Sequence, residues 1–194
     1  MNEERKYEFV LGVSDLGGFE ILEHILNPRP HEFDAGVLFY VNDGSMGDGD
    51  GHPALYDSNR YKTIPKSVYE KTMKLFRETG DKMDELADDA EALDRDLQAG
   101  DYLYLGGSFI YVISTSNVGA ICIRHFGYDG YDLNIDEETD RYLNIKEWLD
   151  DWGLDDDIGE IHVIDMGIYD RALNIAKSSV LEVKSYLKNI LTGK

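Results

Sequence analysis

The sequence has 194 residues, 42% hydrophobic and 30% charged, with a single cysteine, so an internal disulfide is excluded and apolar residues suffice for unaided folding. It holds no apolar run near the ~18 residues of a membrane helix and no signal-type segment behind its charged N-terminus, so we expect a cytoplasmic protein without a membrane partner. Its 39 acidic and 19 basic side chains give a net charge of −20, which opposes direct nucleic-acid binding and favours encounters with basic surfaces.

The N-terminal part of the chain predicts two strands, one short helix and a loop. Apolar residues alternate from Tyr7 to Val13, which indicates a strand. The residues around Glu20 to Leu26 are interpreted as a short helix, and the apolar run Val37–Val41 as a buried strand. Residues 42–53 (NDGSMGDGDGHP) are rich in glycine and aspartate and therefore predict a loop.

Two consecutive helices are predicted next. Pro65 suits the first turn of a helix, and Gly80 is interpreted as the end of that helix. A second helix is expected from Asp81 to Leu97, because apolar residues recur there at intervals of three and four. The segment of about residues 64–98 is therefore a candidate helical insertion.

The centre of the chain predicts antiparallel strands joined by tight turns. Tyr102–Leu105 and Phe109–Ser114 flank a pair of glycines that suits a hairpin turn. A second turn leads into a strand expected at Val118–Phe126.

The C-terminal part predicts a short helix, a strand and a long helix. Asn144 and Glu147 form a capping-box pattern, Glu160–Asp165 is interpreted as a strand, and an apolar stripe predicts a helix from about Tyr169 to Leu191. We therefore expect one α+β domain over residues 1–194, in which a central antiparallel β-meander is packed with amphipathic helices, including a long C-terminal helix.

The negative charge is concentrated in two stretches of the chain. Residues 78–100 carry nine acids and two bases, and residues 129–160 carry thirteen acids and two bases. By contrast, residues 60–77 have a net charge of +5 and residues 170–194 a net charge of +3.

Carboxylates on the helix predicted from Asp81 are expected to face away from its apolar stripe. Neighbours on one helix face lie about 5–6 Å apart, similar to successive phosphates, so the row could imitate a nucleic-acid backbone. An ordinary solvated helix face is the alternative interpretation. The scarcity of lysine on this helix and the second acidic stretch favour a binding surface. The predicted partner contacts are Asp84, Glu85, Asp88, Asp89, Asp155, Asp156 and Asp157.

The loop at residues 42–53 is a candidate site for a divalent cation. Asp48, Asp50 and His52 offer oxygen and nitrogen ligands. The calcium-loop pattern is absent there, and its partial match at Asp132–Asp136 lacks the glycine at the sixth position. Turn geometry is the simpler explanation of the glycines, and no other cofactor is expected.

No catalytic residue is predicted. Cys122 lies between two isoleucines, which indicates an unreactive buried thiol. The five histidines show no metal-ligand spacing. Arg124 and His125, at the end of a predicted strand, are a candidate contact for an anion.

Three short segments resemble the strand–strand–helix portion of SUKH-type immunity proteins. They are Gly100–Leu105, Val118–His125 and Ile145–Leu149. The resemblance covers less than a third of the sequence, and the N-terminal helix of that family has no counterpart here.

From the charge pattern we expect a non-enzymatic binding protein that neutralises a basic partner. That partner would be a nuclease or another nucleic-acid-binding protein, as for anti-defence or immunity proteins. Two alternatives remain open at this point: a metal-dependent enzyme or metal-binding domain that uses residues 42–53, and a structural or assembly subunit.

Overall fold

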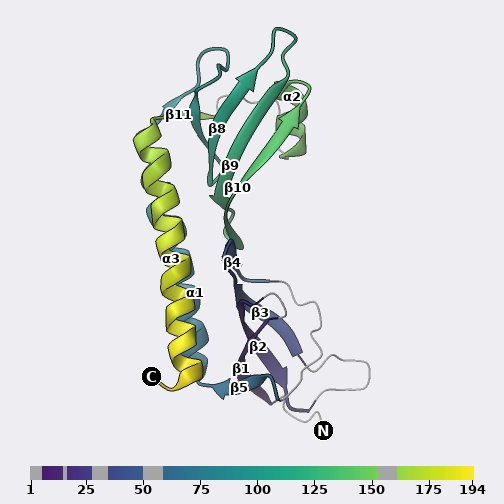
Figure 1. Ribbon diagram of the computed structural model, residues 1–194, viewed down its shortest axis with the longest axis vertical. Coiled ribbons are helices and arrows are strands. Elements are labelled where there is room, and N and C mark those ends of the chain that lie inside the picture. Colours follow the sequence, from purple (N-terminus) through teal and green to yellow (C-terminus); the bar gives the residue numbers. More distant parts are fainter. Residues whose placement is uncertain (1–5, 15–16, 28–34, 50–58, 153–160) are drawn as a thin grey trace. The chain divides into compact units, whose positions relative to one another are not determined.

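The computed structural model describes residues 6–14, 17–27, 35–49, 59–152 and 161–194. Within them the fold is α+β, with antiparallel strands and three helices, the last of which is long and C-terminal (Figure 1). The chain divides into two compact units. Unit 1 comprises residues 1–79, 130–132 and 177–194, and unit 2 comprises residues 80–129 and 133–176. Among the described residues, no helix has the length and apolar composition needed to cross a membrane.

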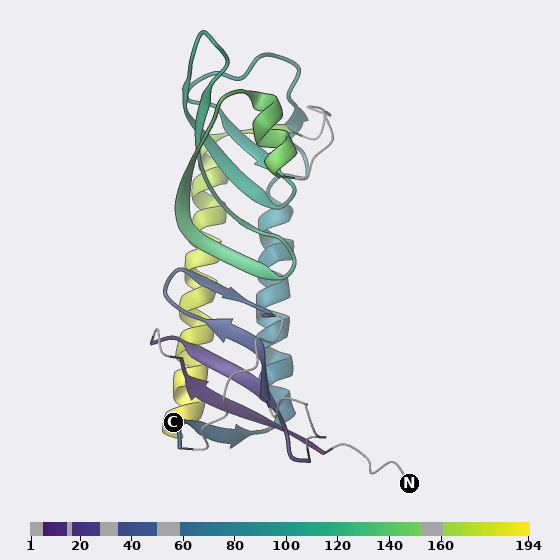
Figure 2. The ribbon, with the colours of Figure 1, turned by 90° about the vertical axis from the view of Figure 1, so that its right-hand side faces the viewer.

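Among its described residues, unit 1 contains five antiparallel strands in the order β5–β1–β2–β3–β4 (Figure 2). Their bounds are β1 Tyr7–Val13, β2 Phe19–Ile25, β3 Ala35–Val41, β4 Ser45–Gly47 and β5 Tyr61–Ile64. β1 therefore has the predicted bounds. The core of this sheet includes Leu11, Leu22 and Phe39, each fully buried.

The short helix predicted around Glu20 to Leu26 is wrong, because this segment is the strand β2. β2 pairs with β1 on one side and with β3 on the other, and a strand between two others exchanges backbone hydrogen bonds on both edges. Its charged residues find partners within the sheet, since His24 Nδ1 lies 2.9 Å from Glu8 Oε1. Sheet pairing thus overrides a local pattern that suits either structure.

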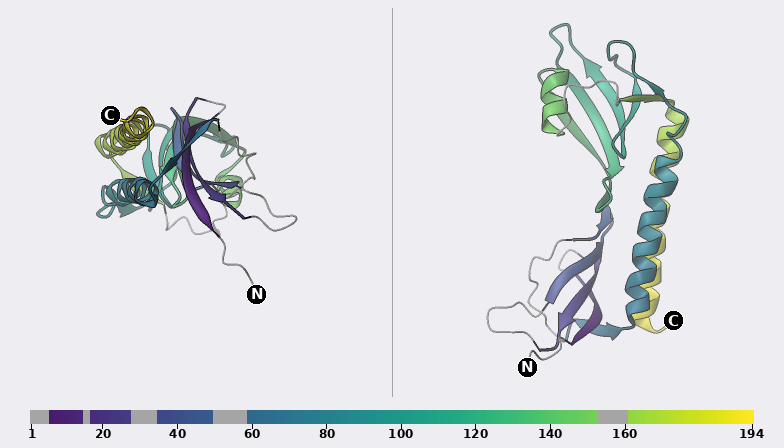
Figure 3. Two further views of the ribbon diagram at one scale, coloured as in Figure 1. Left: turned by 90° about the horizontal axis from the view of Figure 1, so that it is seen from below. Right: turned by 180° about the vertical axis from the view of Figure 1, so that it is seen from behind.

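Two helices contribute residues to both units. They are α1, Lys66–Asp84, and α3, Met166–Thr192. In unit 1 they pack beside each other, with Lys71 Nζ 4.3 Å above the Tyr186 ring (Figure 3). α1 also packs on the sheet of unit 1, where the rings of Phe76 and Phe39 are 5.9 Å apart.

The second predicted helix, from Asp81 to Leu97, is wrong. α1 continues through Gly80 and ends at Asp84, residues 85–89 form turns, and Glu91–Ala92 is the short strand β6. A Cβ atom at Gly80 would lie 2.1 Å from the Tyr128 ring, so this glycine permits close packing inside the helix instead of ending it.

Charge and tertiary pairing explain why the helix does not continue. Extending it would place Asp88 one turn beyond Asp84, and acidic residues near a helix C-terminus oppose the helix dipole. Leu93, expected on the helix stripe, is instead buried in the core of unit 2, and its N–H donates to the Ile161 carbonyl at 2.7 Å. The apolar residues do recur at helical spacing, but Leu93 is buried by packing in the core of unit 2 and not along a helix.

Unit 2 contains strands in the order β10–β9–β8–β7–β11–β6. Their bounds are β6 Glu91–Ala92, β7 Tyr102–Leu105, β8 Ser108–Thr115, β9 Ile121–Tyr128, β10 Asp132–Tyr142 and β11 His162–Ile164. Each pairs antiparallel with its neighbours. β7 has the predicted bounds, whereas β10, with only Leu133 and Ile135 buried along its length, was not predicted.

Both faces of this sheet are covered within unit 2. On one face lies α2, Ile145–Asp151, whose Trp148 is fully buried in a cluster with Ile121 and Ile123. On the other face the Tyr169 ring of α3 contacts Phe126 edge to face at 5.0 Å. α2 begins as the capping-box pattern predicts, because Asn144 Oδ1 accepts the Glu147 N–H at 2.9 Å.

Candidate functional site

The negative charge belongs almost entirely to unit 2. This unit holds 23 acids and 6 bases, a net charge of −17, whereas unit 1 holds 16 acids and 13 bases, a net charge of −3. Among the described residues the counts are 19 acids and 6 bases in unit 2, against 9 acids and 11 bases in unit 1. Apart from Glu78 and Asp132, the acids of the two acidic stretches therefore fall in one compact unit.

The acids of unit 2 also face solvent more often than those of unit 1. Of the 19 described acids of unit 2, 16 are exposed, the exceptions being Asp84, Asp101 and Asp140. Only 3 of the 9 described acids of unit 1 are exposed, namely Asp43, Glu70 and Glu182. Unit 2 thus presents a surface of carboxylates.

The predicted contact residues near the end of α1 do not form a helical row. Asp84 is the last residue of α1, is half-buried, and accepts a hydrogen bond from the Tyr104 hydroxyl at 2.9 Å. Burial raises the pKa of the Asp84 carboxyl above its usual range. Glu85, Asp88 and Asp89 are exposed, but they lie in turns, so the regular phosphate-like spacing expected of a helix face is absent.

Several other predicted site residues lie outside the described residues. These are Asp155, Asp156 and Asp157 of the contact set, and Asp50 and His52 of the metal site. Asp48 is described and half-buried, and its backbone N–H donates to the Tyr131 carbonyl at 2.7 Å. In the described part of the chain no group of three or more His, Cys, Asp or Glu side chains is placed to hold a metal ion. The divalent-cation site stays a prediction.

Tyrosine hydroxyls bind several carboxylates of unit 2. The Tyr169 hydroxyl donates to Glu137 at 2.9 Å, and the Tyr142 hydroxyl donates to Asp151 at 3.1 Å. Burial raises the pKa of Tyr142 to about 12, and burial also raises the pKa of Tyr169. These hydroxyls hold the carboxylates in place while leaving their negative charge uncompensated.

The anion contact predicted at Arg124 and His125 is not formed as a pair. His125 Nε2 lies 2.7 Å from Asp140 Oδ2, and its ring contacts Trp152, which follows α2. Arg124 instead lies near Tyr169, where its charge partly opposes the rise that burial causes in the pKa of that tyrosine. Consecutive residues of a strand point to opposite faces of the sheet, so these two side chains cannot bind one anion together.

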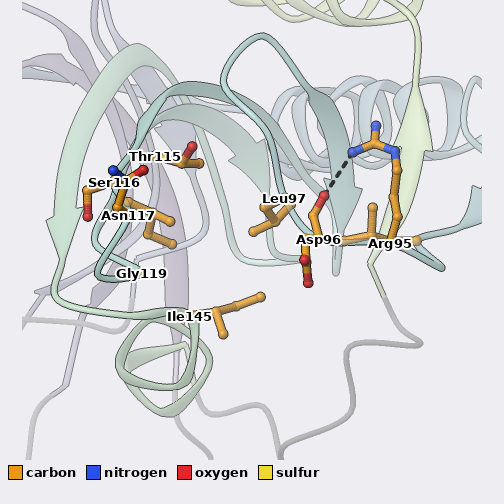
Figure 4. Close-up of a pocket in the computed structure, with 10 residues that line it drawn as sticks. Arg95, Asp96, Leu97, Thr115, Ser116, Asn117, Gly119 and Ile145 are labelled. Carbon is orange, nitrogen blue, oxygen red and sulfur yellow. Dashed lines mark hydrogen bonds between the residues drawn. The ribbon is translucent and has the colours of Figure 1, made fainter.

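A hollow of about 410 Å³ lies at one end of unit 2. One wall is the segment Leu93–Leu97, which follows β6, and the other is the turn Thr115–Gly119 between β8 and β9. Ile121 and Ile145 add apolar surface, and Figure 4 shows Ile145 between Leu97 on one side and Ser116 and Asn117 on the other. This hollow was not predicted, because its walls come from three separate parts of the sequence.

Hydrogen bonds fix the first wall of this hollow. The Arg95 guanidinium makes two 2.8 Å hydrogen bonds to the Asp101 carboxylate. A third hydrogen bond, 3.0 Å long, goes to the Asp96 carbonyl (Figure 4). Asp101 also accepts the Gln98 N–H at 2.8 Å. The hydrogen bonds from Arg95 hold the pKa of the Asp101 carboxyl below its usual range.

Comparisons with protein-family models, with curated proteins and with solved structures found no match for this chain. The charge, the exposed side chains and the hollow of unit 2 are therefore the features that point to a function.

Proposed function

We propose that the protein is a cytoplasmic, non-enzymatic binding protein whose unit 2 neutralises a basic partner, such as a nuclease or another nucleic-acid-binding protein. The observation that carries the proposal is the segregation of charge, with 16 exposed acids on unit 2 and 3 on unit 1 among the described residues. Acids needed only for solubility have no reason to gather on one unit. Clustered charge of one sign accelerates association with the opposite sign and discriminates against other partners.

The proposed frame for these acids is the β7–β10 meander with amphipathic helices packed on it. Two inward-facing clusters support a rigid frame, one with the fully buried Trp148 and the other with the stacked rings of Phe109 and Phe126, 5.4 Å apart. A rigid frame holds the carboxylates apart at fixed positions, so that ordering them on binding costs little entropy.

The proposed contact set includes the three exposed turn residues Glu85, Asp88 and Asp89. None of them makes a side-chain hydrogen bond or ion pair within the described residues, so each is available to a partner. Asp155, Asp156 and Asp157 remain in the proposal as predicted contacts. Resemblance to a nucleic-acid backbone would then depend on the distribution of charge over unit 2 and not on a helical row.

The test compares two variants with the same change of charge. The first is Glu85→Lys, Asp88→Lys, Asp89→Lys in unit 2. The control is Glu70→Lys, Glu78→Lys, Glu182→Lys in unit 1, which breaks only exposed ion pairs of little value to stability. Circular dichroism and thermal unfolding establish that both variants fold.

The measurement is capture from a lysate of the host cells at about 0.1 M and about 1 M salt, between which the Debye length falls from about 10 Å to about 3 Å. We expect the wild-type protein and the unit 1 variant to retain one basic nucleic-acid-binding protein at the lower salt, and the unit 2 variant to lose it. Duplex DNA should compete for the captured protein. Equal retention by both variants, or retention that DNA leaves unchanged, would contradict the proposal.

The two alternatives keep their own tests. A thermal shift with Ca²⁺, Mg²⁺, Mn²⁺ or Zn²⁺ that is lost in Asp48→Ala, Asp50→Ala would support the metal-binding alternative. A large homo-oligomer on size-exclusion chromatography would support the assembly-subunit alternative.

A further inference from the structure

The hollow between Leu93–Leu97 and Thr115–Gly119 carries an uncompensated negative charge at its rim. Its one lining cation, Arg95, is already bound in two hydrogen bonds by Asp101. Asp96 also lines the hollow and is exposed, and its carboxylate has no partner among the described residues. Because Asp101 already pairs with Arg95, the charge of the Asp96 carboxylate is left to attract a cation.

The hollow also has apolar surface beside this charge. Leu97 and Ile145 are partly exposed in it and pack against the buried cluster of unit 2, which includes Leu93 and Ile121. A long side chain with an aliphatic stem and a charged end matches this combination, because the stem can cover apolar surface while the end stays at the rim.

Oxygen atoms on the opposite wall favour arginine over lysine. Ser116 and Asn117 face the hollow across from Asp96 and Leu97 (Figure 4). A guanidinium has five N–H donors in a planar fork and can bind a carboxylate and a neighbouring hydroxyl or amide oxygen together, whereas an ammonium is a point charge with three donors.

Both walls are formed before any ligand binds. The turn is closed by Ser116, whose N–H donates to the Ala120 carbonyl and whose Oγ accepts the Ala120 N–H, both at 2.9 Å. Gly119 adopts a φ of 86° there, which a residue with a Cβ rarely does. The Arg95–Asp101 pair fixes the other wall. A preformed site loses little entropy on binding.

We infer that this hollow binds an arginine side chain of the basic partner, with its stem against Leu97 and Ile145 and its guanidinium at the Asp96 carboxylate. The inference rests on the proposed function for the partner's identity, and it names where on unit 2 a specific contact is made. The volume of about 410 Å³ is within the range of about 300–1,000 Å³ found for ligand pockets, so an aliphatic neighbour of the arginine fits beside it.

The test uses a defined probe and the full chain. Backbone ¹H–¹⁵N spectra are recorded during titration with N-acetyl-leucyl-arginine amide at millimolar concentration. The control probe carries citrulline, which has the shape of arginine without its charge. We expect saturable shifts confined to residues 93–97, 115–121 and 145 with the arginine probe, and none with the citrulline probe.

Two variants separate the specific contact from general charge. Asp96→Asn should weaken binding of the arginine probe about tenfold, because it removes a charge-assisted hydrogen bond. Asp94→Asn removes the same charge from an exposed neighbour that does not line the hollow, and should change affinity by less than about twofold. Dispersed spectra of both variants show that they remain folded.

The inference is overturned by equal binding of the citrulline probe, by shifts spread over all exposed acids of unit 2, by no saturable shift, or by equal losses in the two variants. Capture of a basic partner without probe binding would leave the proposed function standing and reject the hollow. Probe binding without capture would support the hollow and reject the partner.

Discussion

Units 1 and 2 stabilise their acidic side chains in different ways. In unit 1 the partners are chiefly cations: Glu70 lies 3.3 Å from Lys66, Glu78 lies 3.6 Å from Lys74, and Asp43 pairs with Lys184. In unit 2 tyrosine hydroxyls bind Asp84, Glu137 and Asp151, while Arg95 and Lys146 pair with Asp101 and Asp150. A cation cancels the charge of its partner, whereas a hydroxyl only orients it.

This difference shows how a folded unit can remain strongly negative. Like charges that gather on one surface repel one another and destabilise the compact state. Hydrogen bonds from partly or fully buried tyrosines and the apolar cores beneath them help to offset that repulsion with few lysine or arginine partners. In unit 2 the stability therefore comes from the core and the tyrosine hydrogen bonds, whereas the negative surface comes from the exposed carboxylates.

The largest expected effect concerns the core of unit 2. Trp148→Ala should lower the free energy of unfolding by about 3–5 kcal/mol, because the side chain is fully buried. Trp148→Phe should cost much less, since the buried indole N–H has no hydrogen-bond partner in the described part of the chain. Urea unfolding followed by far-UV circular dichroism measures both losses. Equal losses would mean that the aromatic ring kept in Trp148→Phe contributes nothing to stability, against this prediction.

The next effect tests the tyrosine–carboxylate pairs. Tyr104→Phe leaves half-buried Asp84 without its 2.9 Å donor, so we expect a loss of about 1–2 kcal/mol. The matched change in unit 1 is Lys74→Met, which removes the cation from an exposed ion pair and should cost no more than about 0.5 kcal/mol. Thermal unfolding compares them. A larger loss for Lys74→Met would reverse the comparison.

The sequence predicted those parts of the fold in which local pattern and tertiary packing agree. Strand β7, Tyr102–Leu105, and the capping of α2 by Asn144 were found as predicted, because a glycine turn and a capping side chain act on adjacent residues. The residues after Gly80 were not, because Leu93, which fits a helical pattern, is instead buried just after β6, where the Ile161 carbonyl accepts its N–H.

Of the candidate site, the sequence predicted only that acidic residues are concentrated in two stretches. The sequence located the two acidic stretches, but the hydrogen bond that the half-buried Asp84 accepts comes from Tyr104, which lies in a separate strand. The hollow beside Asp96 was beyond sequence reasoning for the same reason, because its opposite wall is the turn at Asn117. Spacing along the chain does not report such contacts.

A smaller effect is expected at alkaline pH. Burial, assisted by the bond to Asp84, raises the pKa of Tyr104 to about 12, and burial raises that of Tyr142 to about 12. Because the pKa in the folded state exceeds the ordinary value of 10.0, the stabilisation is complete below pH 10 and is lost as pH rises towards 12. Absorbance at about 295 nm should show these two hydroxyls ionising after the exposed tyrosines. Tyr104→Phe should remove one late-ionising group, and an unchanged titration would contradict the assignment.

The smallest effect concerns salt. Tryptophan fluorescence reports on unit 2 alone, because the protein has two tryptophans, Trp148 and Trp152, and both belong to this unit. Raising salt from about 0.1 M to about 1 M screens repulsion among the exposed carboxylates. The fluorescence transition should therefore move to a higher urea concentration, and the free energy of unfolding should rise by no more than about 1 kcal/mol. Glu85→Lys, Asp88→Lys, Asp89→Lys relieves part of that repulsion and should reduce the response to salt, whereas the matched unit 1 variant should leave it unchanged. If salt instead destabilised unit 2, its carboxylates would be held by attractive ion pairs, and the contrast between cation-bound and hydroxyl-bound acids would be lost.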